Sequence, residues 1–347
     1  MRHLPNLLQI RKRLLPRIES KRRCETDDFQ HSPPFTSMSA PAYVIISPVR
    51  NEEQFLPCTL KSLAEQTIRP TRWVIVDDGS TDQTKRIAEQ AAEQFPWIKV
   101  VARKDRGFRQ AGTGVIQAFY DGYAAVADDG WDFVVKLDGD VTLLPDYFER
   151  CLAHFAANDR LGIAGGTVCR RVPTGLEPES KVDPPFHVRG ATKIYRRECW
   201  QQIGGLLRQP GWDTLDEVKA NMLGWLTVTF SEIQLEHHRP AGGAYGTWNN
   251  WVKNGLANYI AGYHPLFMAV KCLKRAMNPP VVVGAAGLWW GFLSGYLRGV
   301  AQVDDRELIC YFRKQQISRL LGRPSLWDQK PVLRARATMG VQHTTAQ

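Results

Sequence analysis

Short apolar runs rich in β-branched residues alternate with helix-length amphipathic stretches between residues 43 and 140, and this alternation constrains the fold more than any other feature of the chain. Runs of this kind are typical of strands buried on both faces of a sheet. There are four of them, Tyr43–Ser47, Trp73–Val76, Ile98–Ala102 and Phe133–Leu137. Because strands and helices alternate at close spacing, we expect an α/β domain built on a mostly parallel sheet flanked by helices.

The composition is that of a folded protein with an excess of positive charge. Of the 347 residues, 44% are hydrophobic and 23% are charged, which excludes a wholly disordered chain, a collagen and a polytopic membrane protein. Lys and Arg number 45 against 35 Asp and Glu, so the formal net charge is +10. This excess fits an anionic partner such as nucleic acid, a membrane surface or a phosphorylated substrate.

The chain divides into three regions by composition. Residues 1–41 are basic and polar, and we expect a disordered tail because such a segment buries too little apolar surface to offset its ordering entropy. Residues 42–245 hold the α/β domain, and residues 246–347 form a helical C-terminal region. The first apolar run, Leu7–Ile10, is too short for a secretory signal, so we expect a cytoplasmic protein.

The C-terminal region holds a possible membrane-associated segment at 276–298, in which the stretch Ala276–Leu297 is uncharged. A bilayer-spanning helix needs about 20 apolar residues, and Asn278, Pro279 and Pro280 leave about 17 here. Gly287, Gly291 and Gly295 recur every four residues, the spacing that permits close helix contact in lipid. Two readings stay open, a helix that spans or lies on the membrane and a glycine-rich helix packed on the soluble domain.

Acidic residues follow two of the predicted strands. Asp77-Asp-Gly-Ser-Thr-Asp82 comes after the second strand, and Asp138-Gly-Asp140 comes after the fourth. Ligands bind beyond the carboxyl ends of the strands in an open α/β sheet. Carboxylate oxygens suit Mg²⁺ or Mn²⁺, which keep open positions for substrate phosphates. The pattern predicts a metal-bridged diphosphate site, although Asp-Gly is also a common turn signal.

Several motifs stand in a fixed order along residues 43–240. They are Pro48-Val-Arg-Asn-Glu-Glu53, Val76-Asp-Asp-Gly-Ser-Thr-Asp82, Leu137-Asp-Gly-Asp140, Gly190-Ala-Thr-Lys-Ile-Tyr-Arg-Arg197 and Gly211-Trp-Asp-Thr-Leu-Asp-Glu217, together with the pairs Gly204-Gly205 and Gly224-Trp225. In this order and spacing they resemble glycosyltransferase family 2, the inverting enzymes with the GT-A fold for nucleotide-diphospho-sugars. The resemblance makes 42–245 the catalytic domain.

The resemblance also implies roles for single residues. Asp78 matches the acid that binds the nucleotide base, and Asp138 and Asp140 match the metal and diphosphate acids. Gly190 and Ala191 match the glycine loop beside the sugar and acceptor. The first loop supplies four further substrate-binding residues, Pro48, Arg50, Asn51 and Glu52. We expect most of the basic residues Arg103, Lys104, Arg106 and Arg109 to form a solvated loop, with assistance in phosphate binding as the alternative.

Two assignments depart from the family pattern or depend on a choice. Asp213 takes the place of the general base, but Trp212 stands where the family has Glu, and Asp216 lies one helical turn on. Both are therefore catalytic candidates, and position favours Asp213. The fold often adds a C-terminal histidine to the metal site, for which we choose His238 over His237.

The sequence thus predicts a metal-dependent, inverting glycosyltransferase with Mn²⁺ or Mg²⁺ as cofactor. Its expected donor is a UDP- or GDP-sugar, its acceptor a lipid-linked glycan or a polysaccharide, and its location the inner face of the cell membrane, at an anionic membrane surface. The Gln-x-x-Arg-Trp signature of processive members is absent. A polyprenyl-phosphate glycosyltransferase and a catalytically inactive scaffold are the alternatives. We expect no nucleic-acid partner, because no RNP, helix-turn-helix or zinc-finger signature is present.

Overall fold

The four predicted strands are confirmed in the computed structural model, which describes residues 41–107, 113–180, 182–239, 246–277 and 282–329. They are β1 (Tyr43–Val49), β2 (Arg72–Asp77), β3 (Ile98–Ala102) and β4 (Phe133–Leu137), all paired in parallel in the order β3-β2-β1-β4. The described residues belong to one compact unit, Ala40–Gln347. The predicted tail therefore lies outside them, apart from Pro41.

Beyond β4 the sheet is no longer parallel. The remaining strands within the described residues are β5 (Val141–Leu143), β6 (Leu161–Val172), β7 (Gly175–Pro178), β8 (Thr192–Arg196) and β9 (Leu226–His237). The order continues β8-β6-β9-β5, with β7 paired to β6. Only β6 and β9 pair in parallel here, and the other pairings are antiparallel. The prediction of a mostly parallel sheet thus holds for the first half alone, and the fold is mixed α/β.

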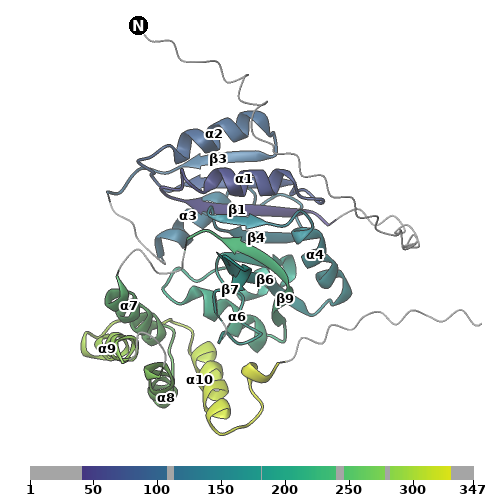
Figure 1. Ribbon diagram of the computed structural model, residues 1–347. Coiled ribbons are helices and arrows are strands. Elements are labelled where there is room, and N and C mark those ends of the chain that lie inside the picture. Colours follow the sequence, from purple (N-terminus) through teal and green to yellow (C-terminus); the bar gives the residue numbers. More distant parts are fainter. Residues whose placement is uncertain (1–40, 108–112, 181, 240–245, 278–281, 330–347) are drawn as a thin grey trace, which may run out of the picture. The chain divides into compact units, whose positions relative to one another are not determined.

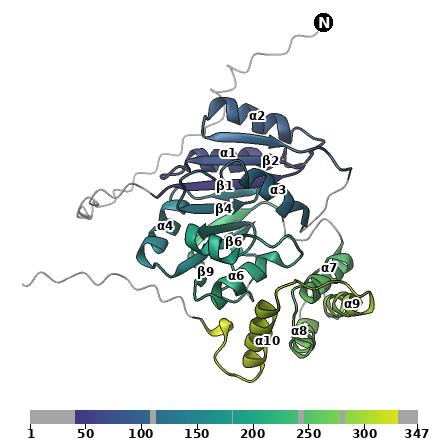
Figure 2. The ribbon, with the colours of Figure 1, turned by 180° about the vertical axis from the view of Figure 1, so that it is seen from behind.

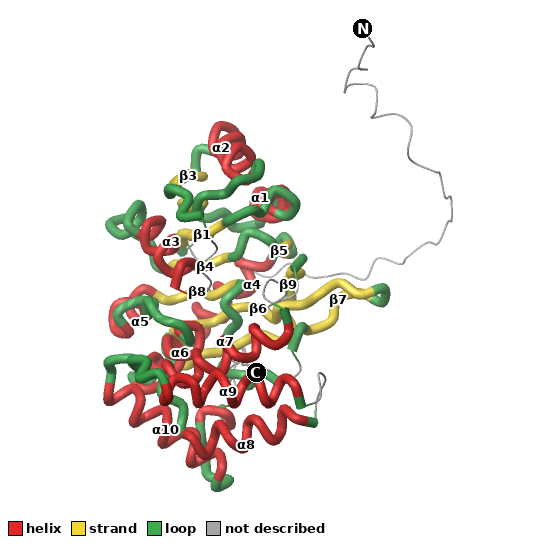
Figure 3. The backbone as a smooth tube through the Cα atoms, turned by 90° about the vertical axis from the view of Figure 1, so that its left-hand side faces the viewer, coloured by secondary structure: helices red, strands yellow, loops and turns green. Residues whose placement is uncertain are grey.

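Two hydrophobic cores lie on the two faces of the sheet. Alternate residues of β1 enter different cores, Tyr43 and Ile45 on one face and Val44 and Ile46 on the other, as the two-residue period of a strand requires. The first face is covered by α1 (Leu56–Ala64), α2 (Thr84–Gln94) and α4 (Tyr147–Ala157). The second is covered by α3 (Thr113–Tyr123), α5 (Arg197–Ile203) and α6 (Trp212–Met222), and Figures 1, 2 and 3 show these layers.

Four helices and a short 3₁₀ helix lie within residues 246–277 and 282–329 of the C-terminal region. They are α7 (Thr247–Ile260), α8 (Pro265–Ala276), α9 (Val283–Leu297), α10 (Arg306–Leu320) and the 3₁₀ helix Leu326–Asp328. A third core includes Phe292 and Phe312 of these helices together with Leu215 and Val218 of α6. The apolar segment 276–298 contributes α9, and its residues 278–281 lie outside the described part. Among the described residues, no helix combines the length and apolar character that crossing a bilayer requires.

Candidate active site

The acids that follow β4 lie at the carboxyl edge of the parallel strands. Asp138 and Asp140 flank Gly139, and the chain then turns back into β5. A Cβ added to Gly139 would lie 2.6 Å from Cγ1 of Val49, the last residue of β1. Only glycine therefore allows the two loops to approach this closely. The loops after β1 and β4 therefore meet here.

Asp138, Asp140 and His237 form a group able to hold a metal ion. Their three ligand atoms, one from each side chain, all lie within 4.8 Å of one another. His237 Nε2 is 3.4 Å from Asp140 Oδ1, and His237 Nδ1 is 2.7 Å from Glu179 Oε1. Two carboxylates and one imidazole, oriented by a further carboxylate, suit a divalent cation such as Mn²⁺ or Mg²⁺. The donor set therefore fits the predicted cofactor.

The histidine in this group is His237, whereas we chose His238 from the sequence. His237 pairs with Val141 across β9 and β5, and successive side chains along a strand point to opposite faces. His238 therefore points elsewhere, where it stacks on Phe55 and contacts Thr142 Oγ1 at 2.8 Å. Ile233 and Leu235 are both buried. They precede His237 by four and two residues and therefore lie on the same face of the strand. The alternation along β9 was thus the sequence signal that favours His237 over His238.

Positive groups surround the two aspartates. Lys136 is buried on β4 and binds both the Asp138 carboxylate and the Gly190 carbonyl. Arg239 reaches Asp140 at 3.2 Å and pairs with Glu52. Burial alone would raise the pKa of Asp140, but His237, Arg239 and Lys136 lower it. Asp140 is thus held ionised by the neighbouring cations.

His237 carries the opposite shift. Burial alone would lower its pKa, but hydrogen bonds with Asp140 and Glu179 raise it to about 10. A cation bound by the imidazole would replace that proton, so metal binding here releases a proton. Lys136, Glu179 and Arg239 were not identified from the sequence. Lys136 could have been identified because it is the one charged residue in the otherwise apolar strand Phe133–Leu137.

Asp78, the predicted base-binding residue, lies at the end of β2 and is almost fully buried. Arg103 and Arg106 both pair with its carboxylate, and Arg50 donates to its backbone carbonyl. Arg50 also pairs with Asp105 at 2.7 Å. Arg103 and Arg106 are therefore not solvated as predicted, because they neutralise a buried acid. Arg109 lies outside the described residues.

Hydrogen bonds between backbone N–H groups and side-chain oxygens tie the first loop to the residues that follow β2. The Asn51 side chain accepts from Thr81 N at 2.9 Å, and Asn51 N–H donates to Ser80 Oγ at 3.0 Å. Glu52 N–H donates to Thr84 Oγ1 at 2.6 Å. Pro48, still within β1, pairs in register with Val76. The predicted substrate-binding residues of the first loop and Asp78 thus lie together.

The glycine loop lies between Asp138 and Asp213. Asp138 N–H donates to the Ala191 carbonyl at 2.9 Å. On the other side, a Cβ added to Gly190 would lie 3.3 Å from the Trp212 ring and 3.9 Å from Asp213 Cβ. Asp213 is half-buried in the first turn of α6. The structure therefore brings together the predicted glycine loop, Asp138 and the candidate base Asp213.

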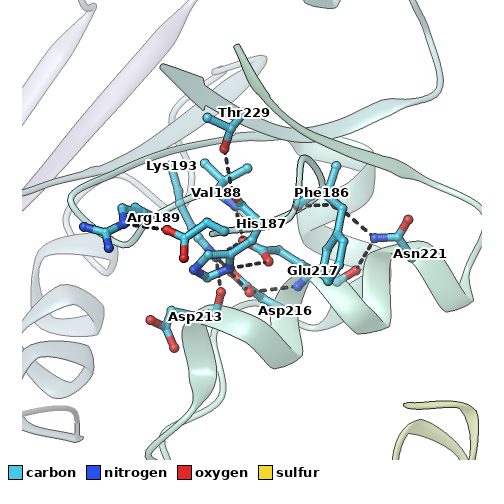
Figure 4. A network of polar contacts seen from close by, with 12 residues as sticks. Phe186, His187, Val188, Arg189, Lys193, Asp213, Asp216, Glu217, Asn221 and Thr229 are labelled. Atoms are coloured by element: carbon cyan, nitrogen blue, oxygen red, sulfur yellow. Dashed lines mark hydrogen bonds and ion pairs between the residues drawn. The ribbon is translucent and has the colours of Figure 1, made fainter. Parts of the chain in front are cut away.

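A buried network of charges lies directly behind Asp213. Lys193 of β8 bonds both carboxylate oxygens of Asp216 at 3.0 Å and lies 2.7 Å from Glu217 Oε1. All three side chains are fully buried. Glu217 in turn binds His187 Nδ1 at 2.9 Å. Figure 4 shows this network, with the Asp213 carboxylate pointing away from it.

Part of the chain is similar to known proteins. Residues 44–208 match glycosyl transferase family 2. The putative glycosyltransferase EpsH of Bacillus subtilis is 30% identical over 115 residues, which is 33% of this chain and 30% of EpsH. The beta-monoglucosyldiacylglycerol synthase of Synechocystis is 24% identical over 244 residues, 63% of this chain and 49% of that synthase. The chain thus spans half or less of the length of these two relatives. The family predicted from the motifs is supported.

The chain is also similar to two solved structures. A mannosyltransferase from Pyrobaculum calidifontis, solved with GDP-Man and Mn²⁺, is 18% identical with a TM-score of 0.47, covering 84% of this chain and 88% of that one. S. aureus TarS 1–349, solved with UDP-GlcNAc, is 16% identical with a TM-score of 0.47. The match covers 80% of this chain and 81% of that one.

Proposed function

We propose that this chain is a metal-dependent, inverting glycosyltransferase of family 2 with the GT-A fold. It transfers a sugar from a UDP- or GDP-sugar to a lipid-linked or polysaccharide acceptor at the cytoplasmic face of the membrane. The observation that carries the proposal is the Asp138–Asp140–His237 group, one loop away from the half-buried carboxylate of Asp213. The family match over residues 44–208 supports the same reaction class.

In this proposal the metal site lies on one side of the glycine loop and the catalytic base on the other. Asp138, Asp140 and His237 would hold Mn²⁺ or Mg²⁺, which supplies Lewis-acid stabilisation of the leaving diphosphate. Lys136 and Arg239 orient the two aspartates and offset their charge. The loop after β2, with Asp78 and Arg50, binds the nucleotide.

Asp213 takes the proton from the acceptor hydroxyl as that oxygen attacks the anomeric carbon and the bond to the diphosphate breaks. General base catalysis of this kind contributes typically about 10²–10⁴-fold. With one base and no covalent intermediate, a single displacement inverts the anomeric centre. Trp212 packs against Gly190, so the acceptor loop and the base are positioned by the same helix start.

The test is release of nucleotide from a panel of UDP- and GDP-sugars with Mn²⁺. The pair of variants is Asp140→Ala and, as a matched control, Asp159→Ala, which alters an exposed acid away from the site. We expect metal-dependent release from one donor, lost in the first variant and kept in the second. Failure of every UDP- and GDP-sugar to bind, measured by calorimetry, would overturn the proposal.

Two further results would replace the proposal by one of its alternatives. Binding without turnover in the presence of lipid-linked and polysaccharide acceptors would indicate an inactive scaffold. Transfer that survives Asp213→Asn would indicate a phosphate acceptor, such as a polyprenyl phosphate, because a phosphate oxygen is already ionised and needs little help from a base.

A further inference from the structure

The helical region that follows the sheet is basic over a long stretch without acids. Between Glu236 and Asp304 the sequence contains no Asp or Glu. It contains six cationic residues, Arg239, Lys253, Lys271, Lys274, Arg275 and Arg298. Helices α7, α8 and α9 all lie in this stretch. The charged side chains that these three helices carry, Lys253, Lys271, Lys274 and Arg275, are therefore all cationic.

Helix α9 is apolar around its whole circumference but is covered on one side only. On the covered side glycines bring α9 against α7, since a Cβ on Gly291 would lie 2.0 Å from the Val252 carbonyl oxygen. On the other side Val283, Trp290 and Leu297 are 45%, 52% and 75% exposed. Their spacing of seven residues places them on one face. A helix that is apolar all round is normally buried in protein or lipid.

Helix α8 repeats this arrangement beside α9, and the two helices lie side by side (Figures 1 and 3). Leu266, Leu273 and Met277 are 55%, 70% and 77% exposed and share one helical face. Lys274, next to Leu273, is exposed as well. Of the thirteen large hydrophobic side chains that are exposed among the described residues, nine lie between Trp248 and Leu297. The exposure is concentrated in one part of the molecule.

We propose that the outer faces of α8 and α9 form a docking surface for an anionic lipid bilayer. Helices that lie in the membrane interface combine leucine and aromatic side chains on one face with nearby Lys and Arg, and tryptophan is enriched at headgroup level. Cationic side chains close to a bilayer are attracted by anionic headgroups. This surface carries all three features, and it binds lipid whether or not the chain transfers sugar.

A second copy of the chain fits the surface less well. A two-fold dimer interface brings the same patch of both subunits together, so Lys274 and its cationic neighbours would face their own copies. Residues 237–303 contain no acid that could lie opposite these cations in such an interface. Anionic headgroups are complementary to this positive charge, and acyl chains supply the cover for Trp290 and Leu297.

The test is flotation of the full chain with vesicles of phosphatidylcholine alone or of phosphatidylcholine mixed with phosphatidylglycerol. The variant is Trp290→Glu/Leu297→Glu. Its matched control is Leu144→Glu/Val182→Glu, which alters side chains 48% and 86% exposed outside α8 and α9. We expect wild type and control to float with the mixed vesicles, and the partition coefficient of the variant to fall at least about tenfold.

The basic tail is present in every protein tested, so it cannot account for a difference between them. The single variant Leu273→Glu alters a side chain that is 70% exposed and tests α8 without disturbing the packing; it too should bind more weakly. The proposal is overturned if wild type floats with neither vesicle, or if both variants float as wild type does. A dimer in solution that Trp290→Glu/Leu297→Glu dissociates would instead assign the surface to a second copy.

Discussion

The first and second turns of α6 each present an aspartate, and the two differ in almost every physical respect. Asp216 is 2% exposed and accepts hydrogen bonds from Lys193, from the Tyr195 hydroxyl at 2.6 Å and from the Glu217 N–H at 2.8 Å. Asp213 is half-buried, borders Gly190 and points away from this network (Figure 4). Asp216 is therefore held within the network as a structural residue, whereas Asp213 points away from these donors and is able to react.

The largest effect that tests this difference is expected from Asp213→Asn. Loss of the general base should lower kcat by about 10²–10⁴-fold. The free energy of unfolding should fall by less than about 1 kcal/mol, the value of one acid at a helix N-terminus. Transfer rates and urea denaturation measure the two quantities, with Asp159→Asn as the control. Transfer at the wild-type rate would contradict the assignment.

Lys193→Met should lower the stability of the fold much more than Asp213→Asn does. It leaves Asp216 and Glu217 buried without their cation, and breaking a buried ion pair costs about 3–5 kcal/mol. The free energy of unfolding should fall by this amount in urea. Lys85→Met, which removes an exposed pair with Glu89, should cost less than about 1 kcal/mol. Equal effects of the two substitutions would show that the network does not stabilise the fold.

Asp216→Asn is the direct counterpart of the first substitution. The amide keeps the shape of the side chain but cannot accept every bond that the carboxylate does, so we expect a loss of about 1–3 kcal/mol in stability. Because Asp216 does not face the substrate in this scheme, kcat of the folded variant should stay close to that of wild type. If kcat fell as far as in Asp213→Asn, the two roles would have to be exchanged.

The smallest effect should be a pH dependence that arises from His187. Burial alone would lower its pKa, but Glu217 raises it, against the opposing effect of Lys193 and with a further contribution from Asp213. A raised pKa gives stability that is fully present below the unfolded value of about 6.5 and is lost as pH rises through the folded value. His187→Gln should therefore cost more stability near pH 5.5 than near pH 9, measured by urea denaturation at both. A constant difference would contradict this.

The parallel half of the fold and most of the candidate site could be predicted from the sequence, because local patterns determine both. Strands such as Trp73–Val76 are continuous apolar runs, and their ends carry acids at the spacing of a known family. The antiparallel half could not be predicted, because pairings such as β4 with β8 join residues about 60 positions apart with no local signal.

The misassigned residues have a similar explanation. The prediction of His238 as the third metal ligand did not take account of the alternation along β9. Ile233 and Leu235 show in the sequence which strand face His237 shares. Lys193 shows no sign in the sequence that it is buried, since only the fold brings it to Asp216 and Glu217. The prediction of solvated arginines after β3 failed in the same way, because their partner, Asp78, lies 25 residues earlier in the chain.

The position of β9 between β6 and β5 determines when the site can first exist during synthesis. β5 pairs with β9 and not with β4, so the strand that brings His237 to Asp138 and Asp140 is made almost 100 residues after them. Nascent chains emerge from the ribosome N-terminus first, and a ribosome-bound chain that ends before β9 would therefore carry both aspartates without their histidine. Metal affinity should thus arise late in translation, once the parallel half of the sheet is already available to fold.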